Sequence, residues 1–312
     1  MTRHPIDQSA AIAGLRGAAP YVRLYKGKVF VIKASGAAFG DAAATRALME
    51  QIAILHHFGI KVVLVHGGGP QLDQMQRSLG IEPRLVRGRR VTDDKSIEAT
   101  TMVLNGLINT RVLASCRELG IDAVGLSGVD AGLVRAKRRP PVSVDGEAVD
   151  YGYVGDIVEI DASVLRKQHE AGLMPVVSPI SADDSGTVLN INADTVAASI
   201  GGALGAEKLI LCTGAPGILE RHGDPRSLVS YTDLAGLRCL EEAGHLGGGM
   251  LPKASAIEAA IRGGVRRVHV ISYDARDALL AEVFTNEGTG TLVVADIKAL
   301  TPAEQHPGAR GA

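Results

Sequence analysis

The sequence is poor in cysteine, in net charge and in long apolar runs, and each scarcity excludes a class of protein. Its three cysteines, Cys116, Cys212 and Cys239, stand singly, without a C-x-x-C pair or a histidine at metal-ligand spacing. Neither a disulfide framework nor a zinc site is therefore expected, and the compartment is expected to be reducing. The formal net charge is −1, so the chain has no general field that would hold nucleic acid.

No apolar run of 18 residues, the length that could span a membrane, occurs in the chain. Asp7 and Arg16 interrupt the mildly apolar N-terminal stretch and break any signal-peptide core. We therefore expect a cytoplasmic protein that has neither nucleic acid nor a membrane as a partner.

Hydrophobic residues make up 46% of the 312 residues, which is enough to bury a full core in one large α/β domain or two lobes. Apolar β-type runs alternate with longer stretches of helical period. The β-type runs lie at 29–32, 62–65, 122–126, 174–178, 208–212 and 267–271, and the helical stretches at about 42–58, 95–119, 162–171, 194–204 and 252–263. This alternation predicts an α/β fold with a mostly parallel sheet and helices on both faces.

Two regions break the alternation and indicate how the chain is divided. Residues 130–160 have the short alternating runs of a hairpin insertion, and residues 179–191 predict a loop or hairpin between two lobes. The predicted parts are an N-terminal arm over 1–28 with a helix at 8–20, an N-terminal lobe over 29–184, a C-terminal lobe over 185–300 and a polar tail over 301–312.

Three segments far apart in the sequence combine glycines with a cationic or ring nitrogen side chain. They are Lys33 to Gly36, His66 to Gly69 and Gly247 to Lys253. Glycines let bare backbone N–H groups approach a phosphate, and two lysines supply positive charge. The three segments together predict phosphoryl transfer, a reaction that needs little proton transfer from the protein, so we expect His66 to be structural.

Arg90 follows Gly88 and stands just before Thr92 and Asp93, either of which can cap the next predicted helix. A guanidinium at that place suits a carboxylate ligand, although a solvated arginine fits the local sequence equally well.

Asn190, Asn192 and Asp194 precede the helix predicted at 194–204. Each could serve only as a helix cap. An aspartate between two lysines could also hold their side chains in place.

In this order, the motifs resemble those of the amino-acid-kinase family, and most closely its members that phosphorylate N-acetyl-L-glutamate. The matching stretches run from Pro20 to about Leu292 and cover nearly the whole chain. The resemblance implies a three-layer αβα sandwich whose N-terminal lobe binds N-acetyl-L-glutamate and whose C-terminal lobe binds ATP. The γ-phosphoryl group would pass to the side-chain carboxylate as a step of arginine biosynthesis. Mg²⁺ would be held mainly through the phosphates rather than by dedicated protein ligands.

The resemblance also implies a role for individual residues. Lys33 would stabilise the transferring phosphoryl group and Lys253 the charge on the leaving ADP, with Asp194 orienting both lysines. The residues implied to hold the acceptor are Gly68, Gly69, Arg90 and Asn190. Those implied to contact the phosphates and the nucleotide are Gly36, Thr213, Gly214, Gly217, Gly248, Gly249 and Met250.

The N-terminal arm is similar to that of arginine-inhibited hexameric members, whose N-terminal helices interlace. Tyr21, Glu282, Gly288 and Gly290 match positions of their arginine site. The resemblance therefore implies a homo-oligomer, either a dimer or a hexamer, that is sensitive to arginine.

The chain departs from the family pattern at Ser35, Val129, Gly214 and residues 272–276. Two alternatives stay open. One is a kinase of a related, carrier-linked acyl-amino acid, against which the run 190–194 argues. The other is a catalytically weak, arginine-sensing regulatory module, motivated by the changes at 35 and 214, although the retention of both phosphate-facing lysines argues against it.

Overall fold

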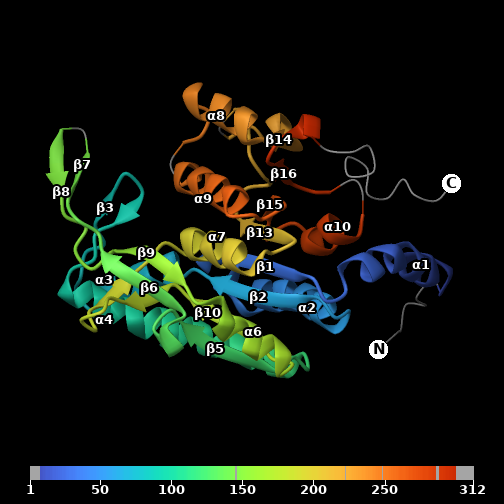
Figure 1. The fold of residues 1–312 in the computed structure, drawn as a ribbon, viewed down its shortest axis with the longest axis horizontal. Helices are drawn as coiled ribbons and strands as arrows, with labels where there is room; N and C mark the ends of the chain where they lie inside the picture. The colour runs from blue at the N-terminus through green and yellow to red at the C-terminus, as the bar shows by residue number, and fades with distance from the viewer. Residues whose placement is uncertain (1–7, 145, 222, 248, 286–287, 300–312) are drawn as a thin grey trace.

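Helices cover both faces of a central β-sheet in the computed structural model of the protein (Figure 1). The structure describes residues 8–144, 146–221, 223–247, 249–285 and 288–299. The tail predicted at 301–312 lies outside these residues. Among the helices in the described part of the chain, none combines the length and the apolar character needed to cross a bilayer.

The central sheet has eight strands, and every neighbouring pair is parallel except β15 with β16. In order across the sheet the strands are β14 (Tyr231–Asp233), β16 (Thr291–Val294), β15 (Arg267–Ser272), β13 (Lys208–Thr213), β1 (Val29–Ala34), β2 (Lys61–His66), β10 (Met174–Ser178) and β5 (Ala123–Ser127). All six β-type runs predicted from the sequence are strands of this sheet. Their continuous apolar character fits strands that are covered on both faces.

Alternate residues of β1 point into two separate hydrophobic cores. Phe30 and Ile32 belong to one core, and Val31 belongs to the other. The first core includes apolar residues of α2, α5 and α10, and the second includes those of α6, α7 and α9. The strand period of two thus divides the helices into two layers and confirms the predicted αβα sandwich.

The helical stretches predicted from the sequence form helices, with one interruption. The α-helices are α1 (Gln8–Tyr25), α2 (Ala42–His57), α3 (Gly69–Ser78), α4 (Asp94–Thr101), α5 (Asn109–Glu118), α6 (Ala162–Glu170), α7 (Ala193–Leu204), α8 (Leu234–Glu242), α9 (Met250–Arg262) and α10 (Ala278–Phe284). The single helix expected at 95–119 contains a π-helical segment, Met102–Ile108, between α4 and α5. Such segments widen a helix locally and are frequent at functional sites.

A smaller four-stranded sheet and two hairpins lie beside the N-terminal half of the central sheet. The sheet has the order β12 (Val188–Asn190), β11 (Ile180–Ala182), β6 (Val134–Arg138) and β9 (Gly155–Ile160). The hairpins are β3 (Leu85–Val86) with β4 (Arg89–Arg90), and β7 (Val142–Val144) with β8 (Glu147–Val149). These strands confirm the predicted hairpin insertion at 130–160 and the hairpin at 179–191. The division into two lobes near 185 stays a prediction.

The N-terminal helix is longer than the sequence predicted. We expected a helix at 8–20 that ends ahead of Tyr21, but α1 continues to Tyr25 with Pro20 inside it. Proline removes a backbone donor from a helix interior. Tyr21 and Tyr25 offset this loss, since both are buried, stack at 6.5 Å and anchor the helix against Phe30 at 5.2 Å. Figure 1 places α1 at the opposite end of the molecule from the β3–β4 and β7–β8 hairpins.

Candidate active site

Lys33, Asp194 and Lys253 meet at the carboxyl end of β1. The Nζ atom of Lys33 lies 2.8 Å from Oδ1 of Asp194, and that of Lys253 lies 3.2 Å from Oδ2. The side chains of Lys33 and Asp194 are buried, and that of Lys253 is 18% exposed. The three residues form one charged cluster, as the sequence predicted, although Lys33 and Lys253 are 220 positions apart in the sequence.

Local structure explains why the three side chains meet. Lys33 shares with Val31 the face of β1 that α7 and α9 cover. Asp194 is in the first turn of α7, where Asn192 caps the helix by accepting from the N–H groups of Asp194 and Thr195. A carboxylate in a first turn is stabilised by the helix dipole. Because α7 packs on α9, Lys253 in the first turn of α9 reaches the same carboxylate.

The cluster has a net charge of +1 when all three groups are ionised. Burial lowers the pKa of Lys33, and Asp194 opposes that shift. Burial alone would raise the pKa of Asp194, but the two ammonium groups outweigh it and hold the pKa below its usual value. The carboxylate is thus kept charged, and one positive charge remains for an anionic ligand.

Two glycine-containing loops approach each other closely beside this cluster. One is the 3₁₀ turn Gly36–Phe39 after β1, and the other is Gly67 to Gly69 at the start of α3. A Cβ on Gly36 would lie 2.6 Å from the Cα of Gly68, so a side chain at Gly36 would force the loops apart. Gln71 also joins the loops by donating to the carbonyl of Gly36 at 2.7 Å. Gly36 is buried in this contact and is not on the wall of the cavities described below.

A cavity of about 420 Å³ opens beside the cluster on the side of the small sheet. Its lining contains every residue predicted to hold the acceptor, namely Gly68, Gly69, Arg90 and Asn190, together with Lys33 and Asp194. The guanidinium of Arg90 donates to Asp73 and, at 2.6 Å, to Gln76, so it is held in place rather than solvated. Asn190 donates to Thr92 over 3.4 Å. We refer to this space as the acceptor cavity.

A second cavity, of about 490 Å³, lies on the other side of the cluster and includes Lys253 in its lining. It also contains the predicted nucleotide residues Thr213, Gly214, Gly217, Gly249 and Met250. Gly248, predicted for the same role, lies outside the described residues. Since Asp194 binds the lysine of each cavity, the cluster stands where the two spaces meet. We refer to this space as the nucleotide cavity.

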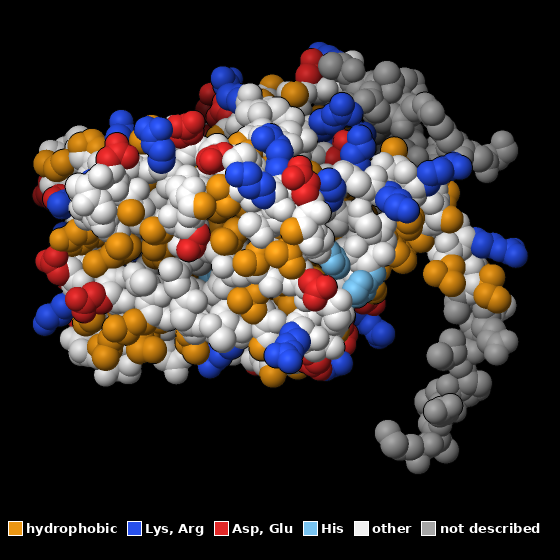
Figure 2. Space-filling model, turned by 60° about the horizontal axis from the view of Figure 1, so that its bottom comes forward, with side chains coloured by type: hydrophobic (Ala, Val, Ile, Leu, Met, Phe, Trp, Pro, Cys, Tyr) orange, Lys and Arg blue, Asp and Glu red, His pale blue; other side chains and the backbone are white. Residues whose placement is uncertain are grey.

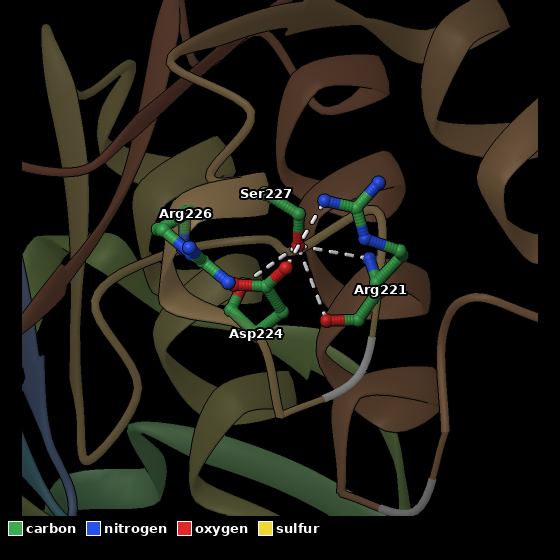
Figure 3. A network of polar contacts seen from close by, with 4 residues as sticks. All are labelled: Arg221, Asp224, Arg226 and Ser227. Carbon is green, nitrogen blue, oxygen red and sulfur yellow. Dashed lines mark hydrogen bonds and ion pairs between the residues drawn. The ribbon is translucent and has the colours of Figure 1, made fainter.

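A compact loop forms part of the wall of the nucleotide cavity, to which it contributes Leu219 and Gly223. Figure 3 shows its polar network. Asp224 accepts from Arg221 at 3.0 Å and from the backbone N–H of Arg226 at 3.0 Å, and Ser227 donates to the carbonyls of Arg221 and Asp224. These bonds fix the loop within itself, because its arginines are largely exposed and have no charged partner from another element among the described residues.

Sequence reasoning missed several cavity residues. Arg89, Arg139 and Leu104 line the acceptor cavity, and Ser35 and His245 line the nucleotide cavity. The run Arg138-Arg139-Pro140-Pro141 was the one available signal for Arg139, and it indicates only a hairpin. Leu104 belongs to the π-helical segment and contacts Gly68, a proximity that no local pattern predicts.

His66 is structural, as predicted. Its ring is fully buried, lies at the edge of Phe39 and is 3.2 Å from Nδ2 of Asn109. Burial lowers the pKa of His66 to about 4, so the ring is neutral at pH 7. Within the described residues, no group of three or more His, Cys, Asp or Glu side chains could hold a metal ion.

The residues predicted for an arginine site lie near α1 and α10. Tyr21 lines a groove of about 850 Å³ between these helices. The Glu282 carboxylate is buried and accepts from the N–H groups of Thr289 at 2.7 Å and Gly290 at 3.3 Å, and a Cβ on Gly288 would lie 3.0 Å from it.

The same carboxylate continues into a buried polar chain that the sequence did not predict. His269 is 2.7 Å from Glu282, and its other ring nitrogen is 3.1 Å from Nζ of Lys208. The Lys208 ammonium in turn lies 5.2 Å from the centre of the Tyr25 ring. This contact links α1 to the buried polar residues Lys208, His269 and Glu282.

Comparisons with known proteins identify the family of this chain. The model of the amino acid kinase family matches residues 28–272. The acetylglutamate kinase of Myxococcus xanthus is 48% identical over 90% of this chain and 94% of its own length. That of Symbiobacterium thermophilum is 43% identical over 94% of this chain and 100% of its own.

Solved structures extend the comparison to the fold. N-acetylglutamate synthase from Neisseria gonorrhoeae, complexed with coenzyme A and N-acetyl-glutamate, has a TM-score of 0.80 at 29% identity, over 95% of this chain and 67% of that one. Carbamate kinase from Giardia lamblia shares the fold with a TM-score of 0.61 at 20% identity, over 86% of this chain and 99% of that one. The family match, the curated relatives and the shared fold lead to one conclusion: the chain belongs to the amino acid kinase family.

Proposed function

We propose that this protein is an acetylglutamate kinase, which transfers the γ-phosphoryl group of ATP to the side-chain carboxylate of N-acetyl-L-glutamate in arginine biosynthesis. The observation that carries the proposal is the Lys33–Asp194–Lys253 cluster at the junction of two cavities, in a chain whose curated relatives at 40–48% identity bear that name. The acceptor and the nucleotide would then occupy the two cavities on opposite sides of the cluster.

The reaction moves one phosphoryl group between two oxygens. A side-chain carboxylate oxygen of the acceptor bonds to the γ-phosphorus, the bond from that phosphorus to the bridging oxygen of ATP breaks, and the electron pair leaves with ADP. The product is an acyl phosphate. Because negative charge spreads over in-line oxygens in the transition state, catalysis is mainly positioning and electrostatic stabilisation.

The residues of the cluster divide this task. Lys33, on the acceptor side, stabilises the transferring phosphoryl group, and Lys253, on the nucleotide side, stabilises the charge on ADP. Asp194 orients both ammonium groups. The N–H groups of Gly68 and Gly69 serve the phosphoryl and substrate oxygens, and Gly36, which lines neither cavity, holds the second loop in position.

The two cavities supply the binding contacts. Arg90 and Asn190 hold the α-carboxylate and acetamido ends of the acceptor. The turn from Thr213 to Gly217 and the residues Gly248 to Met250 hold the nucleotide. Mg²⁺ would be held mainly through the phosphates of ATP and by water, and would supply charge neutralisation of the phosphates.

The test is ADP release with N-acetyl-L-glutamate and MgATP. The wild-type protein should release ADP only when both substrates are present. Lys33→Ala and Lys253→Ala should each lower kcat by about 10²–10³-fold, by analogy with lost oxyanion donors. Lys61→Ala, an exposed lysine at the start of β2, is the control and should leave kcat unchanged.

Each alternative predicts a different outcome of the same assay. Turnover only with a carrier-linked acyl-amino acid would reassign the acceptor. A folded protein that binds arginine without releasing ADP would indicate a regulatory module. An active wild type with unimpaired lysine variants would reject the roles of the cluster.

We also propose that the protein is a cytoplasmic homo-oligomer, a dimer or a hexamer, that is inhibited by arginine. The support is the projecting helix α1 and the position of Tyr21 and Glu282 in neighbouring elements. Figure 2 shows the arm with hydrophobic side chains on its surface, and Ile12 and Leu15 of α1 are 51% and 66% exposed. Apolar groups exposed on a helix are suited to contact with another chain.

A further inference from the structure

Arg139 is an ordered residue of the acceptor cavity, and the proposed function gives it no role. It lines the cavity directly after the end of β6. Its Nε and Nη2 atoms both donate to Oδ1 of Asp156, at 2.9 and 2.6 Å, and its guanidinium lies 6.0 Å from the centre of the Tyr151 ring. The side chain is only 18% exposed. The guanidinium is therefore held in one orientation, which is what a recognition site needs.

The backbone places Arg139 across one extended segment from Asn190. The N–H of Arg139 donates to the carbonyl of Val154 at 2.8 Å, and the N–H of Asn190 donates to the carbonyl of Tyr153 at 2.8 Å. Consecutive carbonyls of an extended chain point to opposite edges, so Arg139 and Asn190 flank this segment on its two sides. Two strand spacings put their backbones roughly 10 Å apart, with both side chains on the cavity wall.

The guanidinium of Arg139, a residue of the cavity lining, has donors that no described residue uses. Its contacts with Asp156 use Nε and Nη2, and among the described residues no side chain or carbonyl is hydrogen-bonded to Nη1. Arg90 uses one donor of each Nη atom, on Gln76 and Asp73, and so also keeps N–H groups for a ligand. Arg139 thus retains an amino group with two N–H donors for a ligand.

The lining of the cavity has an excess of positive charge, and two of its arginines are also paired with acidic residues outside the lining, Arg90 with Asp73 and Arg139 with Asp156. Four cationic side chains, those of Lys33, Arg89, Arg90 and Arg139, line the cavity, and Asp194 is the single acidic residue among the described lining residues. An acceptor with two carboxylates would place the reacting one at Lys33. The other would then lie away from the cluster, among the arginines.

We propose that Arg139 is a specificity-determining residue that donates from Nη1 to the non-reacting carboxylate of the acceptor and so rejects acceptors that lack this charge. The inference rests on the proposed function and adds a second guanidinium to the carboxylate contact of Arg90. In the competing explanation, Arg139 only ties β6 to β9 through Asp156.

The experiment compares two acceptors that differ in one group. N-acetyl-L-glutamate has a free α-carboxylate, whereas N-acetyl-L-isoglutamine has an uncharged amide at that position and keeps the same reacting carboxylate. Initial rates of ADP release give kcat and KM for each acceptor with the wild type, Arg139→Met, Arg139→Lys and Arg138→Met. Arg138 is the matched control, because it is a neighbouring arginine that pairs with Asp150 and does not line the cavity.

In Arg139→Met we expect KM for N-acetyl-L-glutamate to rise about 10- to 100-fold with kcat changed less than about threefold, as for a lost charged hydrogen bond. The preference for the carboxylate over the amide, measured as the ratio of kcat/KM values, should fall by a similar factor. Arg139→Lys should recover part of the preference, and Arg138→Met should retain all of it.

Two results would overturn the inference. If Arg139→Met impairs both acceptors equally, so that the preference is unchanged, Arg139 has only a structural role. If the Arg139→Met variant has wild-type kinetics, Arg139 has no role in binding the acceptor. A wild type that turns over neither acceptor would reject the proposed function itself, and this inference with it. Thermal unfolding of each variant identifies any that fails to fold. If Arg139→Met fails to fold, the test is whether Arg139→Lys has a smaller preference for the carboxylate over the amide than the wild type.

Discussion

Asp194 uses the two oxygens of one carboxylate to hold two lysines that serve different substrates. Oδ1 contacts Lys33, which lines the acceptor cavity, and Oδ2 contacts Lys253, which lines the nucleotide cavity. The arrangement fixes the spacing of the two ammonium groups before any ligand arrives. Preorganised charge of this kind costs no reorganisation during the reaction.

Asp194→Asn should change the pH dependence of the reaction as well as its rate. Burial lowers the pKa of Lys33, and the Asp194 charge is the strongest group opposing that shift. Without this charge the pKa of Lys33 falls further, so the ammonium is lost at lower pH. We expect kcat to fall about 10-fold or more at neutral pH and its alkaline limb to move to lower pH.

The measurement is kcat against pH from about pH 6 to 10 for the wild type and the variant. Asp161→Asn, which alters the exposed cap of α6, serves as the control and should have the wild-type profile. An alkaline limb that stays in place in Asp194→Asn would contradict the idea that loss of the Lys33 charge limits the reaction.

The sequence predicted the cluster and the glycine-rich parts of both cavities because short motifs carry them. Glycine runs at strand ends and helix starts have local physical causes, and so do caps such as Asp93, whose side chain accepts from the N–H of Ser96. Arg139 and the Lys208–His269 pair could not be predicted in the same way. Their surroundings come from strands and helices distant in sequence, and no local period encodes which neighbour a side chain will meet.

At the scale of elements, the site depends on two loops that touch through glycines. The 3₁₀ turn after β1 and the loop before α3 approach so closely that Gly36 has no room for a side chain against Gly68. Leu104 and Ile108, both in the π-helical segment, contact Gly68 from the other side. A Cβ on Gly68 would lie 2.5 Å from each of them. The sequence predicted the loops but not the π-helical segment, whose wider turn has no distinct residue pattern.

Gly36→Ala should separate the two loops. The new Cβ would lie 2.6 Å from the Cα of Gly68 and 2.8 Å from its nitrogen, and backbone atoms cannot rotate away. A displacement of about 1 Å at a reacting centre can cost about 10²-fold in rate, so we expect kcat to fall by that order. Steady-state ADP release measures the effect.

Gly106→Ala provides the matched control for that substitution. Gly106 lies in the π-helical segment, and a Cβ there would have no atom within 4 Å. Wild-type kcat in Gly36→Ala would mean that the contact between the loops does not position the reacting groups.

At the scale of the whole molecule, α1 projects from one end, and most of its described side chains are exposed (Figure 1). Its last turns are anchored by Tyr21 and Tyr25, whereas Ile12 and Leu15 face outward. If this surface joins two copies of the chain, the double variant Ile12→Ser/Leu15→Ser should give a smaller species than the wild type and reduced inhibition by arginine. Light scattering and arginine titration of the ADP-release assay measure the two effects.

Leu79→Ser is the control for this prediction, because Leu79 is 54% exposed at the end of α3 and far along the chain from α1. It should leave both the mass and the inhibition unchanged. A wild type that is monomeric and indifferent to arginine would refute the proposed assembly and its regulation together.

The pairing of β1 with both β2 and β13 limits how the enzyme can open. β1 and β2 belong to the first predicted lobe and β13 to the second, and the β1–β13 ladder runs in parallel register from Phe30 with Lys208 to Ala34 with Cys212. Any movement of one half toward the other would therefore have to twist or bend the sheet at this ladder, with the strands still paired. A chain cut at the 183–187 turn is therefore expected to remain one particle, because the β1–β13 ladder still joins its two pieces.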